Sequence, residues 1–256
     1  MSFTRIFTKS KLLGATLVLA TSVAFAAEWN YNLSDTVHGP AAWGTIEGYE
    51  LCGTGQKQSP IDLGKSSDFR LSKITFNYNP AALNVVNNGH TIQVNVDNGS
   101  TITIGKETYR LLQFHFHTPS EHSKNSKRTA MEVHFVHVNS AGVLAVVGAF
   151  IKEGRANSVI QAIWDIAPHE AGSVSSPTTI DQRALLGGRD AGAEYYNYSG
   201  SLTTPPCTEG VRWHVLDGSI EASAEQVAHF VSLLHDGHNS RPVQDLNGRK
   251  VLKRND

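Results

Sequence analysis

Three histidines in two short segments have the residue type and spacing to bind one metal ion. In the segment 113–117, aromatic and polar residues alternate, which predicts a strand with His115 and His117 on one face. In the segment 131–138, His134 occupies one face of a second predicted strand. If the two segments pair as an antiparallel hairpin, the three imidazoles converge. Three neutral imidazoles with one open position are typical of catalytic zinc, whereas structural zinc sites have four protein ligands.

The residues two positions before two of these histidines suit the second ring nitrogen of each ligand. Gln113 precedes His115 on the same face, and Glu132 precedes His134 in the same way. Metal-bound imidazoles usually donate their other N–H to an acceptor. The alternative is that each histidine is an ordinary sheet residue, but three in register with two acceptors on the same face favour a metal.

The strands that must position these residues belong to a β-rich chain. In the stretch 61–104, β-branched runs at 74–76, 83–86 and 91–96 are separated by Asn-Pro and Asn-Gly turns, which predicts an antiparallel meander. The segment 144–150 is nearly all apolar and is predicted to be a central strand.

Two helices are predicted from apolar spacing and capping signals. One follows Asn157 and ends before Pro168; the other begins at Ser223, with Gln226 completing a capping box, and stops at Gly237. The fold class predicted from these patterns is therefore predominantly β, a single domain with a large, mostly antiparallel sheet and a few short peripheral helices.

The first 26 residues have the composition of a secretory signal. Basic residues precede an apolar run at 12–20, and Ala-Phe-Ala at 24–26 is a small-x-small cleavage site. We expect a signal peptide at 1–26, a mature catalytic domain at 27–256, and export to the periplasm or beyond. The alternative, an N-terminal membrane anchor, requires a longer apolar run than this one.

Charge and cysteine content limit the partners and the compartment. Removal of residues 1–26 leaves 19 Lys and Arg against 23 Asp and Glu, a balance near −4 that offers no basic surface for nucleic acid or anionic lipid. Cys52 and Cys207 are the only cysteines. Export favours a disulfide between them, and two unpaired buried thiols are the alternative.

Several longer motifs occur in order along the chain. They are Gly39-Pro40 with Trp43-Gly44, Gln58-Ser59-Pro60-Ile61, Asn87-Asn88-Gly89-His90, the two histidine strands, Ser120-Glu121-His122, and Ser201-Leu202-Thr203-Thr204-Pro205-Pro206-Cys207. In these motifs the chain resembles one known family, the α-class carbonic anhydrases of the exported bacterial type. The resemblance implies a central twisted sheet of about ten strands and a zinc lyase that reversibly hydrates carbon dioxide to bicarbonate and a proton. It implies no membrane partner after signal cleavage and a monomer or homodimer.

The resemblance also implies roles for residues beside the metal. Hydroxide on Zn²⁺ would donate a hydrogen bond to Thr203, which donates its own proton to Glu121, while Thr204 lines the pocket nearby. His90 would carry the proton released in each cycle to solvent.

The same resemblance implies two walls around the open metal position and two cis peptide bonds, before Pro60 and before Pro206. The apolar wall that would receive carbon dioxide comprises Val136, Val146, Leu202, Val211 and Trp213. The polar wall comprises Tyr31, Asn88, Gln93 and Thr204.

Two other protein classes compete with this interpretation. A cupin-type barrel that binds iron or manganese fits His115, His117 and Glu121, but Arg128 stands where the cupin motif has glycine. A non-catalytic binding module on the carbonic anhydrase scaffold is the second, although such relatives typically lose a zinc ligand. A zinc peptidase is disfavoured because His-Glu-x-x-His does not occur.

Overall fold

A computed structural model describes residues 28–97, 99–187 and 193–255. The predicted signal peptide, 1–26, lies outside the described residues. Within those residues, no helix is both long enough and apolar enough to cross a lipid bilayer.

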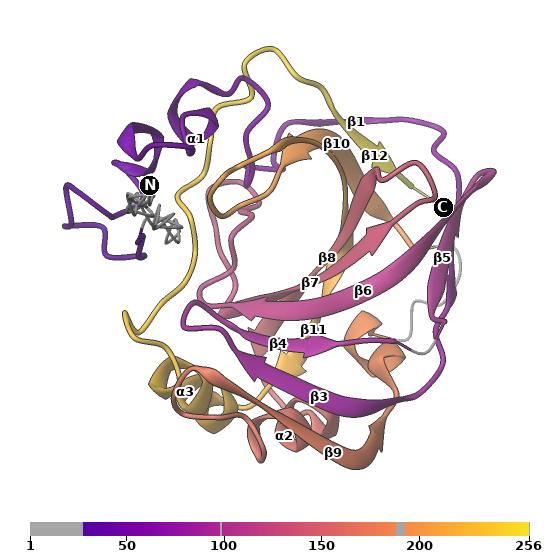
Figure 1. The fold of residues 1–256 in the computed structure, drawn as a ribbon. Coiled ribbons are helices and arrows are strands. Elements are labelled where there is room, and N and C mark those ends of the chain that lie inside the picture. Colours follow the sequence, from indigo (N-terminus) through magenta and orange to yellow (C-terminus); the bar gives the residue numbers. More distant parts are fainter. Residues whose placement is uncertain (1–27, 98, 188–192, 256) are drawn as a thin grey trace, which may run out of the picture.

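The described residues form one domain built on a twelve-stranded sheet (Figure 1). Ten strands follow one another in the order β1-β12-β10-β11-β8-β7-β6-β4-β3-β9, and β2 joins the sheet through β5, which also pairs with β6. The strands are β1 (Ser66–Asp68), β2 (Ile74–Asn77), β3 (Ala81–Asn87), β4 (Ile92–Asn95), β5 (Thr101–Ile104), β6 (Glu107–His117), β7 (Met131–Val138), β8 (Leu144–Glu153), β9 (Gly172–Ile180), β10 (Tyr195–Ser201), β11 (Glu209–Ala222) and β12 (Val251–Arg254).

The predicted architecture is confirmed, with one correction to the pairing. Only the β1–β12 and β8–β11 pairs are parallel, and β8 lies inside the sheet as expected. Of the meander predicted over 61–104, the antiparallel pairing of β3 with β4 is confirmed, but the place of β2 is wrong, because β2 pairs with β5 rather than with its sequence neighbour β3. Turn residues indicate where a strand ends, whereas partner choice depends on non-local packing that local signals do not encode.

The helices are short and cover one part of the sheet. Figure 1 shows α2 (Ser158–Trp164) and α3 (Ala224–Ser232) beside β3 and β9. Asn157 caps α2, and the predicted capping box of Ser223 and Gln226 is present on α3. The remaining helices are α1 (Leu51–Thr54) and the 3-10 segments Trp43–Thr45 and Gln182–Leu186.

The two faces of β6 have different environments, as its alternation predicts. Phe114 and Phe116 are fully buried in the main core. The Phe116 ring packs edge-on against Trp164 of α2, with ring centroids 4.8 Å apart. These buried contacts fix the position of β6 in the core. The histidines on the opposite face of the strand are therefore held at a constant spacing.

Candidate active site

Strands β6 and β7 place the three predicted ligands next to one another. They pair antiparallel with His115 directly opposite His134, which confirms the expected hairpin. One ring nitrogen from each of His115, His117 and His134 lies within 4.8 Å of the other two. His117 and His134 are each 1% exposed, so most of the group is shielded from solvent.

The two acceptors expected from the sequence hold their histidines. Nδ1 of His115 donates to Oε1 of Gln113 at 2.8 Å, and Nε2 of His134 donates to Oε1 of Glu132 at 2.9 Å. These bonds leave Nε2 of His115 and Nδ1 of His134 facing the centre of the group. The second ring nitrogens are therefore fixed as a metal site requires.

The acceptor for the third histidine was not predicted. Nδ1 of His117 donates to the main-chain oxygen of Asn239 at 2.8 Å, 122 residues away in the sequence. The Asn239 side chain reinforces this contact by accepting from the Thr118 N–H at 2.8 Å and donating to the Phe116 carbonyl at 2.8 Å. A main-chain acceptor has no residue-type signature, so no sequence signal could have identified it.

Burial keeps the cluster in the form that binds a metal. Desolvation, together with the neighbouring imidazoles His117 and His134, holds the pKa of His115 well below its usual 6.5. Desolvation also lowers the pKa of His117. Neutral imidazole has a lone pair to donate, and Nε2 of His117 is buried without a hydrogen-bond partner in the described chain.

A second group of potential ligands, His122, Glu132 and His134, is committed to hydrogen bonding instead. Oε1 of Glu132 accepts from His134 and also from Nδ1 of His122 at 2.8 Å, and Nε2 of His122 contacts the Tyr198 hydroxyl at 2.7 Å. Burial acts to raise the pKa of Glu132, but His122 and His134 outweigh it and hold that pKa well below its usual range. An ionised Glu132 therefore orients His134 and does not compete for the metal.

Glu121 lies beside the ligands with one oxygen free. Its Oε1 accepts from the Arg241 N–H at 2.9 Å. Its Oε2 has no hydrogen-bond partner among the described residues and lies 3.6 Å from Nε2 of His117 and 3.8 Å from Nδ1 of His134. The bond expected from Thr203 is thus not formed here, and the group of three converging ligand atoms does not include Glu121.

The loop that carries Thr203 and Thr204 is fixed by a disulfide. Cys52 and Cys207 are bonded, with their Cα atoms 5.0 Å apart, which confirms the pairing expected for an exported protein. The Cys207 N–H donates to the Thr204 carbonyl at 2.8 Å. Both expected cis bonds, before Pro60 and Pro206, are present, together with an unforeseen one before Pro119.

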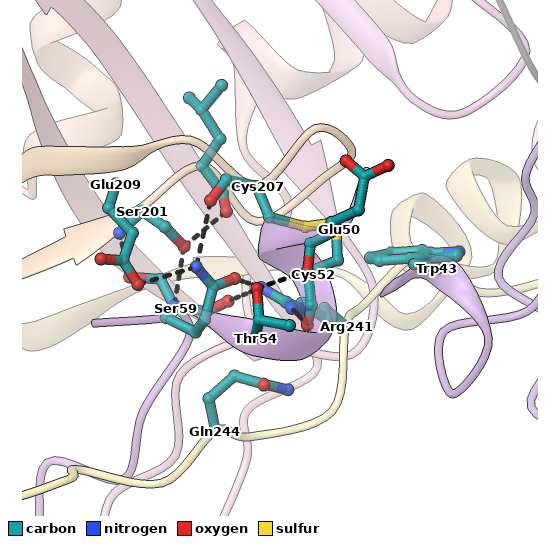
Figure 2. The surroundings of a disulfide bond; sticks show 12 residues. Trp43, Glu50, Cys52, Thr54, Ser59, Ser201, Cys207, Glu209, Arg241 and Gln244 are labelled. Atoms are coloured by element: carbon teal, nitrogen blue, oxygen red, sulfur yellow. Dashed lines mark hydrogen bonds between the residues drawn. A yellow bond between two sulfur atoms is a disulfide. The ribbon is translucent and has the colours of Figure 1, made fainter. Parts of the chain in front are cut away.

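A buried arginine joins this loop to Glu121. Figure 2 shows Arg241 below the disulfide, and its guanidinium carbon lies 5.7 Å from the centroid of the Trp43 ring. The Arg241 guanidinium donates to the carbonyls of Cys52 and Ser59 at 2.9 and 2.8 Å, while its own main-chain N–H holds Glu121. Desolvation lowers the pKa of Arg241 to about 10, so the side chain stays charged at neutral pH.

The residues of the expected apolar wall form one cluster. Val146, Val211 and Trp213 are buried together, with Val136 and Leu202 packed against them. The Trp213 ring lies 4.8 Å from that of His134, centroid to centroid.

The residues of the expected polar wall lie in different environments. Tyr31 is only 2% exposed and packs with Trp43 and the disulfide. The Asn88 side chain accepts from the N–H groups of His90 and Thr91, which makes it a turn-stabilising residue. Gln93 pairs opposite His115 in the sheet, and Thr204 is half-buried.

His90 lies against the N-terminal segment. Its imidazole stacks on the Trp29 indole with ring centroids 3.7 Å apart and planes 7° apart. Its main-chain oxygen accepts from the Asn239 side chain at 3.1 Å, which ties the turn of His90 to the residue that holds His117.

Comparison with known proteins identifies the family of this site. A model of eukaryotic-type carbonic anhydrases matches residues 38–255. The chain belongs to the α-carbonic anhydrase family. It is therefore an enzyme of the carbonic anhydrase type.

Individual relatives span nearly the whole chain. It is 40% identical to a carbonic anhydrase of Pectobacterium carotovorum over 247 residues, which are 92% of this chain and 97% of that protein. It is also 40% identical to a carbonic anhydrase of Neisseria gonorrhoeae over 252 residues, 94% and 96% of the two chains. The solved α-carbonic anhydrase of Thermovibrio ammonificans, in complex with sulfanilamide, matches with a TM-score of 0.82 and 40% identity over 89% of this chain and 100% of that one.

Proposed function

We propose that the chain is an exported zinc enzyme that reversibly hydrates carbon dioxide to bicarbonate and a proton. The observation that carries the proposal is the convergence of three imidazole nitrogens, from the buried His117 and His134 and the half-buried His115, each with its other ring nitrogen held by an acceptor. Membership of the carbonic anhydrase family gives the reaction class.

The residues present fit Zn²⁺. Three imidazole nitrogens that converge without a fourth ligand atom from the described residues in their group match the ligand set of a catalytic zinc. The unpartnered Nε2 of His117 is a buried donor atom that a bound cation would satisfy. When bound, zinc supplies hydroxide at neutral pH by lowering the pKa of water from about 15.7 to about 7, an effect for which carbonic anhydrases are the standard example.

Thr203 and Glu121 are proposed to orient the attacking oxygen. An ionised carboxylate can only accept hydrogen bonds, so a hydroxyl that donates to Glu121 must itself accept from the next group. Oε2 of Glu121 is free and buried, while Oε1 is fixed by Arg241, so the acceptor position is rigid and unoccupied by other donors. Thr203 would bridge to it once the nucleophile is in place, with Thr204 beside it.

The substrate is proposed to rest against the apolar cluster beside His134. Carbon dioxide has no hydrogen-bond donor and no net charge, so a wall of aliphatic and aromatic carbon removes little solvation from it. Trp213 and Val136 are the members of this cluster nearest the histidines. The Trp213 ring packs on His134, and Val136 lies on the same face of β7 as His134.

His90 is proposed to relay the released proton, and the chain is proposed to act in the periplasm or outside the cell. An imidazole has the pKa range needed to exchange protons near neutrality. A disulfide and similar bacterial carbonic anhydrases support export.

Stopped-flow carbon dioxide hydration, combined with metal analysis, tests the proposal. Wild-type protein should contain one zinc per chain and be active, His115→Ala should lose zinc and activity, and the exposed His38→Ala should behave as wild type. Zinc-loaded wild type without activity would favour the binding module. Equal activity in His115→Ala would overturn the ligand assignment, and iron in place of zinc would favour the cupin chemistry.

A further inference from the structure

The surroundings of His90 include an acidic residue from the far end of the chain. The Trp29 ring that stacks on His90 belongs to a short N-terminal stretch, and Tyr31 in the same stretch packs edge-on to His90 at 6.4 Å between ring centroids. The N–H of Tyr31 donates to Oδ2 of Asp236 at 2.9 Å, a contact between residues 205 positions apart. The Asp236 side chain is 17% exposed, so this bond is largely shielded from water.

Asp236 belongs to the same segment that fixes a metal ligand. Three residues later, Asn239 accepts from His117 through its main-chain oxygen and donates to the His90 carbonyl through its side chain. The segment 236–239 therefore contacts the ring support of His90, its main chain and one histidine of the metal site. Motion of this segment would change the position of the imidazole relative to the metal ligands.

We propose that Asp236 is a positioning residue for proton transfer: its carboxylate holds the Trp29–Tyr31 stretch against His90 and presents negative charge to the ring that receives the proton. This inference rests on the proposed role of His90 as the proton relay.

The charges around His90 support this role. Burial lowers the pKa of His90, and the carboxylates of Asp236 and Glu28 oppose that shift. His90 and Asp236 line an open groove of about 680 Å³, which is roomy enough for many waters. The other charged or titratable groups that face this groove are Glu28, His169, Glu170 and His235.

A carboxylate at this position has a direct consequence for the relay. A proton acceptor is most effective when its pKa is near the operating pH, and burial alone moves His90 away from that range. The charge of Asp236 restores part of the proton affinity without a direct bond to the ring. The hydrogen bond to Tyr31 keeps the charge and the ring in a constant geometry.

Two substitutions separate charge from tethering. Asp236→Asn removes the charge and retains a side-chain oxygen that can accept from Tyr31, whereas Asp236→Ala removes both. Glu170→Gln is the matched control, because it removes a carboxylate from the same groove at a residue that makes no contact with Tyr31 and is not among the charges that act on His90.

The measurements are NMR titration of the His90 imidazole and stopped-flow hydration of the zinc-loaded enzyme in weak buffer. In Asp236→Asn the His90 pKa should fall and kcat should drop about two- to fivefold, because transfer to a weaker base is slower. The ratio kcat/KM should stay unchanged, since proton release follows the conversion of carbon dioxide. Added imidazole buffer should restore kcat, and Asp236→Ala should show a larger loss.

Three results would overturn the inference. An unaltered His90 pKa in Asp236→Asn would remove the electrostatic role, and an equal fall of kcat and kcat/KM would indicate damage to the metal site instead. An effect of Glu170→Gln as large as that of Asp236→Asn would show that the charge at Asp236 has no special place. The proposed relay is tested separately: if His90→Ala retains full kcat, His90 is not the relay, whatever Asp236 does to its pKa.

Discussion

Each imidazole of the metal site is held by a different kind of acceptor: a side-chain amide, a carboxylate and a main-chain carbonyl. The first two, from Gln113 and Glu132, were predictable because a residue two positions earlier on a strand shares its face. The third, from Asn239, was not, because it comes from a distant segment and uses an atom that every residue has. Local periodicity therefore predicts ligands and same-strand supports, but not supports that tertiary structure brings in.

Replacement of Glu121 tests the orienting pair at the level of one atom. Glu121→Gln retains an oxygen for the Arg241 N–H but presents an amide in which one of the two terminal atoms is a donor. Thr203 could then no longer be fixed as a donor toward it, and kcat/KM for hydration should fall about a hundredfold. Zinc content and the melting temperature should be nearly unchanged. A variant with full activity would contradict the proposed orienting role.

His137 and His214 make stability depend on pH. Desolvation lowers the pKa of His137 to about 3 and that of His214 to about 4, so both are neutral in the folded chain. The unfolded chain takes up these protons near pH 6.5, and the folded chain does so only at much lower pH. The contribution of these two histidines to the free energy of unfolding is therefore complete above pH 6.5. It should decrease as the pH falls from 6.5 toward 3, by on the order of 4 kcal/mol for His137.

Urea unfolding of metal-free protein at several pH values checks this dependence without interference from zinc release. His137→Gln should reduce the slope between pH 6.5 and 4, because Gln can still contact Tyr78 but does not titrate. The exposed His38→Gln should leave the slope as in wild type. Identical slopes in His137→Gln and wild type would show that His137 is not the source.

At the scale of elements, strands with a clear pattern were predicted and strands without one were missed. β7 was bounded correctly at Met131–Val138 because Val and Phe recur through the segment between the polar residues Glu132, His134 and His137. β9 is an edge strand of mostly exposed Ser and Thr with Pro177 inside it, so it carries neither alternation nor an apolar run. The partner of β2 could not be predicted from local sequence either, because β3 and β4 come between β2 and β5 along the chain.

A single glycine shows how closely two strands approach at the metal site. Gly148 of β8 lies opposite His134, and a Cβ added there would be 2.8 Å from Oε1 of Glu132. Gly148→Ala should therefore displace the carboxylate, weaken zinc binding about 10- to 100-fold and cost about 1–3 kcal/mol of stability.

Chelator competition and thermal unfolding measure these two effects. Gly172→Ala, in edge strand β9, is the control, because its added Cβ would be 3.8 Å from the nearest atom. Unchanged zinc affinity in Gly148→Ala would show that Glu132 adapts without loss.

At the scale of the molecule, the disulfide closes a very long loop. Cys52 and Cys207 are 155 positions apart, so the bond restricts the unfolded chain strongly. The double variant Cys52→Ser/Cys207→Ser should lose about 3–5 kcal/mol of unfolding free energy. Wild type in reductant should match it in a denaturant titration, and a variant as stable as oxidised wild type would contradict the expectation.

The family and the overall class were predictable from ordered motifs such as Gln58-Ser59-Pro60-Ile61, whereas the arrangement of the whole molecule was not. Three residues near the C-terminus, Asp236, Asn239 and Arg241, contact Tyr31, His117 and Glu121 respectively. No sequence motif links any of these residues to the residue that it contacts. Their contacts depend on the path of the C-terminal segment between α3 and β12, which is yellow in Figure 1.

The metal strands lie in the interior of the sheet, where β6 is bonded to β4 and β7, and β7 to β6 and β8. Fraying at the margins, at β9 or β1, leaves these ladders intact. Separating the three histidines requires several of these strand pairings to open together, which is a motion close to global unfolding. The apoprotein should therefore keep the three histidines in place for as long as it stays folded, and metal-free protein should rebind the ion without refolding.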